Sequence, residues 1–119
     1  MLRFGALTLA AGLCLTAPAH ADAYERLLRE EIFRGIAARS IPGYRGIELL
    51  RRPSDDTVEF VTLMRFDSLD AVRAFAGDDY EAAVVPPRAR ELLLRFDARS
   101  AHYEVRETSP PGRPEGRGS

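Results

Sequence analysis

The chain of 119 residues contains no lysine, asparagine, glutamine or tryptophan, and its single cysteine is Cys14. Without lysine, no side-chain amine can form a Schiff base with a carbonyl substrate. A single cysteine excludes an internal disulfide bond and any zinc site built from several cysteines. The two histidines, His20 and His102, lie far apart in the sequence, so we expect no metal site.

The chain also lacks an excess of charge of either sign. Its 17 basic residues other than histidine are all arginine, and 18 acidic residues balance them to a formal net charge of -1. Nucleic-acid binding needs a basic surface field, so nucleic acid is not an expected partner. With 45% hydrophobic residues, the chain has enough apolar material for one core and no room for a second domain.

Residues 1–21 are compatible with a secretory signal. Arg3 is followed by an apolar run from Phe4 to Leu15, and Ala19-His20-Ala21 has the small-x-small pattern of a cleavage site. The run is too short for a permanent membrane-spanning helix, so we expect no stable membrane span. Cleavage after Ala21 would export the mature chain.

The same segment also has the alternation of a β-strand, with Leu7, Leu9, Leu13 and Leu15 on one face and small residues on the other. A ferredoxin-like sheet places its first strand in the middle, and losing it would leave buried backbone groups unpaired at ~1–3 kcal/mol each. We favour this strand and a cytoplasmic protein, with the exported form as the alternative. A mistaken start codon that replaced the true first strand is a third possibility.

Hydrophobic periodicity and capping residues predict the order of elements in the rest of the chain. Asp22 and Glu25 resemble a capping box, Ser68 is a good N-cap, Gly77 a good helix end, and a proline pair opens the last helix. The predicted elements are a helix over 23–39, strands over 44–52 and 57–66 around a turn at 53–56, a helix over 69–76, a helix that includes Ala89, Leu92, Leu93 and Phe96, and a strand over 100–106.

Three stretches carry a family resemblance: IPGYRGIELLRR, VEFVTLMRFDSLDAVRAFAGDDYEAAVVPP and LLLRFDARSAHYEV. Over residues 22–107 the chain resembles the antibiotic biosynthesis monooxygenase type domain of the dimeric α+β barrel superfamily. The resemblance implies a ferredoxin-like β-α-β-β-α-β antiparallel sheet with helices on one face. Residues 108–119 have no apolar anchor and are expected to be a disordered tail.

The resemblance also implies a homodimer that packs sheet to sheet. An apolar second sheet face, Val61 and Leu63 with Ile47 and Leu49 or the opposite set, fits this expectation because helices can cover only one face. The superfamily includes oxygenases, heme-degrading enzymes and proteins with no assigned reaction, so the resemblance implies a fold better than an activity. The heme-degrading set uses an Asn and a Trp, and this chain has neither.

The resemblance implies a cofactor-independent oxygenase that acts on a small aromatic or quinone-like compound. His102 is the candidate base, and Tyr44 and Arg65 are candidate pocket residues, with Phe60 and Phe66 as apolar substrate contacts. Such an enzyme needs a base and an apolar cavity, and we expect no cofactor.

The alternatives are structural. The sequence is also compatible with a structural role for two of these residues. His102 would then be a strand residue that pairs with a neighbour, and Arg65 would form an ion pair with Glu48, Glu59 or Asp97. An enzyme should place at least two of Tyr44, Arg65 and His102 on one cavity wall. A non-catalytic dimeric module that binds a small ligand or serves a stress or accessory role could scatter them.

Overall fold

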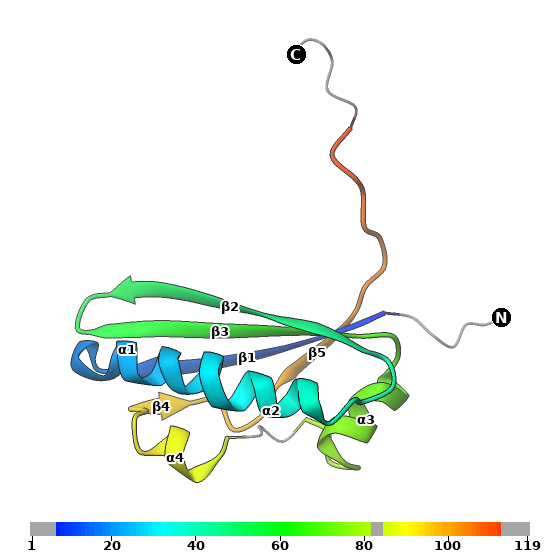
Figure 1. Cartoon of the computed structure of the whole chain (residues 1–119). Helices are drawn as coiled ribbons and strands as arrows, with labels where there is room; N and C mark the ends of the chain where they lie inside the picture. Colours follow the sequence, from blue (N-terminus) through cyan, green and yellow to red (C-terminus); the bar gives the residue numbers. More distant parts are fainter. Residues whose placement is uncertain (1–6, 82–84, 113–119) are drawn as a thin grey trace, which may run out of the picture.

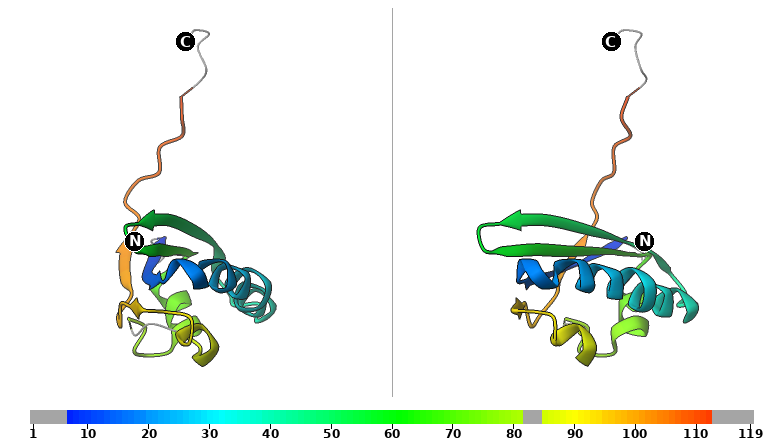
Figure 2. Two further views of the ribbon diagram at one scale, coloured as in Figure 1. Left: turned by 90° about the vertical axis from the view of Figure 1, so that its left-hand side faces the viewer. Right: turned by 60° about the vertical axis from the view of Figure 1, so that its left-hand side comes forward.

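A computed structural model describes residues 7–81 and 85–112, which form one antiparallel sheet with the helices on one of its faces (Figure 1). Figure 2 shows the same two layers from two further sides. The elements in chain order are β1 (Thr8–Thr16), α1 (Pro18–Leu27), the π-helical turn η1 (Leu28–Ile32), α2 (Phe33–Ala38), β2 (Tyr44–Ser54), β3 (Thr57–Phe66), α3 (Leu69–Ala76), α4 (Pro87–Arg90), β4 (Arg95–Phe96) and β5 (Ala101–Glu104).

Strand β1 is the centre of the sheet. It pairs with β3 along its whole length, from Thr8 opposite Phe66 to Thr16 opposite Val58, and its other edge pairs with β5 and β4. The prediction of a strand in this leucine-rich segment is therefore confirmed. Its inward face carries the small or polar residues, and Thr8 and Thr16 are buried.

The first helix begins at Pro18, so the predicted start at Ala23 with a cap at Asp22 was wrong. Ala17 has extended backbone angles, and Pro18 occupies the first turn, where its missing N–H costs no hydrogen bond. Asp22 and Glu25 instead accept hydrogen bonds from Arg51 on β2, at 2.9 and 2.7 Å.

Two predicted helix ends around α3 are confirmed. The Ser68 hydroxyl accepts a hydrogen bond from the backbone N–H of Ala71 at 3.3 Å, and Gly77 ends the helix with φ of 88°. A positive φ at a helix end favours glycine, which has no Cβ. The sequence also predicts a connector over residues 78–85, of which residues 82–84 lie outside the described residues.

The predicted long helix after the prolines was wrong, because α4 is a single turn and Phe96 lies on a strand. The backbone N–H groups of Leu94 and Asp97 donate to the carbonyl oxygens of Leu15 and Leu13 on β1, at 2.8 and 3.0 Å. Hydrogen bonds to the sheet edge replace those that would continue the helix. The last strand is also shorter than the predicted range of 100–106.

The strand register corrects the predicted grouping of the two sheet faces. Ile47 lies opposite Met64 on the helix-covered face, whereas Leu50 lies opposite Val61 on the other face. Directly opposed residues of an antiparallel pair share a face. Ile47 and Leu49 therefore belong to the core side, and Val61 and Leu63 share the outer face with Leu50.

The predicted tail is only partly described. Residues 105–112 contain no helix or strand and run away from the sheet (Figure 1), while residues 113–119 lie outside the described residues.

Candidate functional site: a cavity between the helices and the sheet

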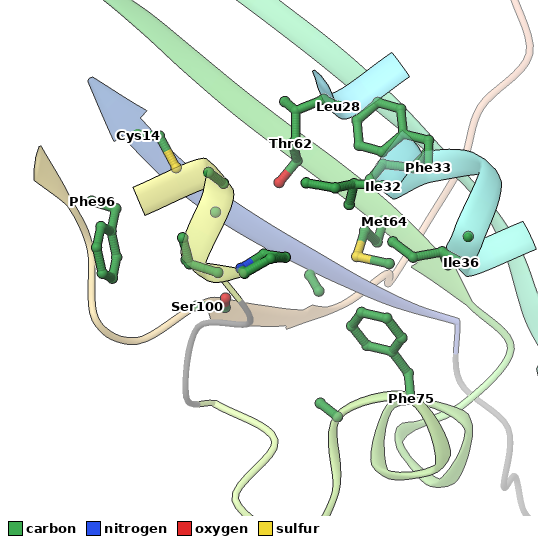
Figure 3. Close-up of a pocket in the computed structure, with 18 of the residues that line it drawn as sticks. Cys14, Leu28, Ile32, Phe33, Ile36, Thr62, Met64, Phe75, Phe96 and Ser100 are labelled. Atoms are coloured by element: carbon green, nitrogen blue, oxygen red, sulfur yellow. The ribbon is translucent and has the colours of Figure 1, made fainter. Parts of the chain in front are cut away.

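A cavity of about 330 Å³ lies between the helical layer and the inner face of the sheet. This volume is within the range of small-molecule pockets. Most of its wall is apolar (Figure 3), and the larger lining side chains include Leu28, Ile32, Phe33, Ile36, Met64, Phe66, Phe75 and Phe96. The cavity therefore suits a compact apolar or aromatic molecule.

The helical wall contains the π-helical turn η1. Its residues Leu28, Glu31 and Ile32 all line the cavity. A π-turn widens the helix locally and often occurs at functional sites. Here it lies where the helix faces the cavity.

His102 on β5 is the imidazole in the cavity wall, and it is half-buried. Its Nδ1 lies 3.1 Å from the carbonyl oxygen of Ser100. A carbonyl can only accept, so the neutral ring carries its hydrogen on Nδ1 and keeps the lone pair on Nε2. The ring can therefore accept a proton from a bound molecule.

The hydroxyl groups of Thr62 and Ser100 lie near Gly12 and form a polar part of the cavity wall. A Cβ atom placed on Gly12 of β1 would lie 3.2 Å from Thr62 Oγ1 and 4.0 Å from Ser100 Oγ. Figure 3 shows both hydroxyls among the residues around the cavity. Within the described residues neither hydroxyl has a hydrogen-bond partner, so both are available to a polar atom of a ligand.

Cys14 and Tyr24 also line the cavity, and both the thiol and the phenol keep their protons at neutral pH. Burial raises the pKa of the Cys14 thiol. Burial likewise raises the pKa of Tyr24. Because the thiolate is the reactive form of cysteine, Cys14 is a poor nucleophile at neutral pH.

The structure brings only some of the predicted site residues together. His102 and Phe66 line the cavity, whereas Tyr44, Arg65 and Phe60 do not, contrary to expectation. The predicted roles of all five in substrate binding or catalysis stay predictions.

The three residues outside the cavity have other surroundings. Tyr44 packs on Phe66 with ring centroids 5.6 Å apart, and Phe60 packs edge to face on Tyr24 at 5.0 Å. Arg65 is on the outer sheet face, where it pairs with Glu48 at 3.1 Å. The interpretation of Arg65 as an ion-pair partner is confirmed.

Sequence reasoning missed several cavity residues. Thr62 shares a strand face with Phe60 and Met64, so the alternation along β3 places it on the inner face, but it was not among the predicted site residues. Tyr80 follows α3 without regular structure, and no sequence signal pointed to it. Its position depends on how the chain leaves the helix.

Within residues 7–81 and 85–112, no group of three or more acidic, cysteine or histidine side chains is placed to hold a metal ion. In the same ranges, no helix has the length and apolar character needed to cross a membrane.

Solved structures of other proteins share this architecture. A variant of SnoaB, a cofactor-independent oxygenase from Streptomyces nogalater, superposes with a TM-score of 0.60 at 21% identity, covering 89% of this chain and 99% of its own. The monooxygenase from the gene ActVA-Orf6 of Streptomyces coelicolor, in complex with Nanaomycin D, gives 0.55 at 18% identity, covering 91% and 94%. This chain has the fold of the antibiotic biosynthesis monooxygenase domain.

The same fold serves more than one reaction. The heme-degrader MhuD of Mycobacterium tuberculosis, with two hemes bound in its active site, also superposes on this chain. Its TM-score is 0.52 at 18% identity, covering 86% of this chain and 99% of its own. No family model and no curated protein matches this chain. Likeness at these identities establishes the fold and leaves the reaction to the site.

Proposed function

We propose that the protein is a cofactor-independent monooxygenase that acts on a small aromatic or quinone-like compound bound in the cavity. The observation that carries the proposal is the Nε2 lone pair of His102 in the wall of an apolar cavity. SnoaB has the same fold and is a cofactor-independent oxygenase, which supports the proposal by analogy.

The chemistry begins with a proton transfer from an acidic O–H or C–H group of the compound to Nε2 of His102. The electron pair stays on the compound, whose carbanion carbon forms a C–O bond with dioxygen and, on taking a proton, gives a hydroperoxide. Loss of the second C–H proton breaks the O–O bond, so one oxygen atom stays on the compound as a carbonyl and the other leaves as water, with the compound as the only electron donor. The hydroxyls of Thr62 and Ser100 are free to donate to a developing oxygen anion. Donors fixed in an apolar site stabilise such charge more strongly than water-exposed ones.

One observation favours a second candidate, a non-catalytic module that binds a small ligand. Of the three polar residues predicted to share one wall, only His102 lines the cavity. A binding module needs the apolar cavity and no base. It would bind the same class of compound and consume no oxygen.

Oxygen uptake separates the two candidates. We expect the intact protein to consume oxygen with an active aromatic substrate, and His102→Ala to lose this activity by roughly 10²–10⁴-fold while still binding the compound. His20→Ala is the matched control, since His20 is exposed on α1 and does not line the cavity. Unchanged uptake in His102→Ala would reject the base, and ligand binding without uptake by the intact protein would support the module.

We also propose that the protein is a homodimer joined through the outer sheet face. The helices leave this face open, and it carries Leu13, Val61 and Leu63 half-buried, with Leu50 47% and Tyr103 58% exposed. Apolar area of this kind marks an interaction surface.

Sedimentation at micromolar concentration should show a dimer. Leu63→Glu should dissociate this dimer, whereas Ala37→Glu, on the opposite side, should not. A monomeric intact chain would reject the proposal.

A further inference from the structure

Gly35 is an exposed residue inside helix α2, and it also lines the cavity. Glycine inside a helix is less stable than alanine because it gives up more conformational freedom on folding. A glycine at such a position therefore calls for a physical reason.

The usual two reasons do not apply to Gly35. Glycines 43, 46 and 77 have a positive φ, and Gly35 does not. A Cβ atom on Gly43 would also lie 2.8 Å from that of Ala71, whereas a Cβ on Gly35 would meet no heavy atom within 4 Å apart from its chain neighbours and the backbone of its own helix. Neither the backbone nor close packing requires glycine at 35. What the missing side chain provides is open space beside the cavity.

The exposed cavity residues of this helix form a single row. Glu31, Gly35 and Arg39 are spaced by four residues, so they follow one another along one helix face. The other lining residues of the same helix are buried or half-buried: Tyr24, Leu28, Ile32, Phe33 and Ile36. Along this helix the cavity therefore meets the surface at this row, with Gly35 at its middle.

The two charged members of the row are tied to the elements opposite. Glu31 pairs with Arg88 of α4 through both carboxylate oxygens. Arg39 donates to the carbonyl oxygens of Phe75 and Ala74 in α3, at 3.1 and 3.4 Å, and lies 5.2 Å from the centre of the Phe75 ring. These contacts hold the helix to α4 on one side of Gly35 and to α3 on the other.

We propose that Gly35 is the entrance through which a small apolar or aromatic ligand reaches the cavity. The proposal rests on the proposed function, because it assumes that such a ligand binds there. A larger side chain at 35 would narrow the passage between the Glu31 and Arg39 contacts. It would leave the deeper wall around His102 and Thr62 unchanged. Gly35 therefore governs how fast a ligand enters and leaves.

Stopped-flow fluorescence with naphthol tests this entrance in the full chain, since naphthol emission changes on transfer from water to an apolar site. We expect Gly35→Leu to slow association and dissociation by a similar factor, roughly tenfold for a modest added barrier, with Kd nearly unchanged. Ala37→Leu is the matched control, because Ala37 is exposed on the same helix and does not line the cavity. Its two rates should equal those of the parent protein.

The outcomes separate the entrance from the binding function. Unchanged rates in Gly35→Leu would overturn the entrance while leaving ligand binding intact. A raised Kd with faster dissociation would overturn it too, because the leucine would then occupy the binding site itself. Absence of naphthol binding by the parent protein would overturn the proposed ligand binding at this cavity, and the entrance with it.

Thermal unfolding gives a second measurement. Gly35→Ala should raise the melting temperature by a few degrees, because alanine is the better helix former and its methyl group meets no neighbour. A lower melting temperature would show that the backbone at 35 needs glycine, and it would overturn the inference that open space is the reason for it.

Discussion

The ring of Tyr80 meets the imidazole of His102 edge to face, with ring centroids 5.2 Å apart and planes at 89°. The guanidinium of Arg73 lies over the same Tyr80 ring, 5.4 Å from its centre. The carbonyl of Ser100 holds the imidazole at Nδ1. The candidate base is therefore oriented by a ring contact and a backbone hydrogen bond.

The ring contact makes Tyr80 a positioning residue for His102. Tyr80→Phe should keep most of the oxygenase activity, because the aromatic edge remains, whereas Tyr80→Leu should lower kcat roughly tenfold, less than loss of the base itself. Proton NMR gives an independent measurement, since the ring-current shift of the His102 protons should persist in Tyr80→Phe and disappear in Tyr80→Leu. Equal activity of the two variants would contradict this role.

The thiol of Cys14 provides an internal test of cavity occupancy. Because burial raises its pKa, Cys14 should react with a thiol reagent at pH 8 several-fold more slowly than free cysteine. Since Cys14 lines the cavity, saturating naphthol should slow the reaction further. Labelling followed by mass spectrometry measures both effects, with Cys14→Ser as the unlabelled control. Labelling at the same rate with and without naphthol would mean that the compound binds elsewhere.

Removal of residues 1–21 should prevent folding. A chain that starts at Asp22 loses β1, which pairs with three other strands, and it also loses Ala21, which is 0% exposed in the core. Each buried backbone group left unpaired costs about 1–3 kcal/mol, against a total stability of about 5–15 kcal/mol for a small domain. Circular dichroism should show no cooperative thermal transition for the truncated chain.

The same reasoning predicts that the working protein keeps β1. The intact mass of the protein from its own cell should include this segment. A mature form that begins at Asp22 and unfolds cooperatively would contradict the central position of β1 and favour export.

Stability in acid should depend on the pair of Arg45 and Asp67. Arg45 donates from Nε and Nη2 to both carboxylate oxygens, at 2.6 and 2.7 Å, and these hydrogen bonds lower the pKa of Asp67. The folded pKa is below the unfolded one, so the pair stabilises the fold above the unfolded value of about 3.9. That stabilisation is lost as the pH falls through the folded value.

The matching variant is Arg45→Met, in which the pKa of Asp67 should rise toward its ordinary value and the acid-dependent part of stability should shrink. Carboxyl NMR titration of both proteins measures the change. A pKa of Asp67 that is equal in the two proteins would show that Arg45 does not hold this carboxylate in solution.

Local patterns in the chain predicted most of the elements correctly. The alternation in β1 and β3, the Ser68 cap and the Gly77 helix end all appeared in the structure. Each depends on residues within one or two turns or a few strand positions, so nearest neighbours in the sequence decide it. The predicted start of the first helix was wrong because Asp22 and Glu25, which look like a capping box, instead accept hydrogen bonds from Arg51 on a distant strand.

The candidate site was only partly predictable for the same reason. His102 was found from its residue type. Tyr44 is on the helix-covered face opposite Phe66 but packs on that ring instead of lining the cavity, whereas Arg65 is on the outer face. A shift by one residue moves a side chain to the opposite face. Gly35 and Tyr80 carried no signal at all, since their importance comes from what lies beside them.

The sequence by itself determined the antiparallel α+β fold with β1 as its first strand, because hydrophobic period and capping are local properties. The tertiary structure alone decided where the last helix stops, since hydrogen bonds to the distant carbonyls of Leu13 and Leu15 end it. It also decided the cavity, whose wall joins residues from Ala10 to His102. Strand register and helix packing set that wall, and both depend on contacts between residues far apart in the chain.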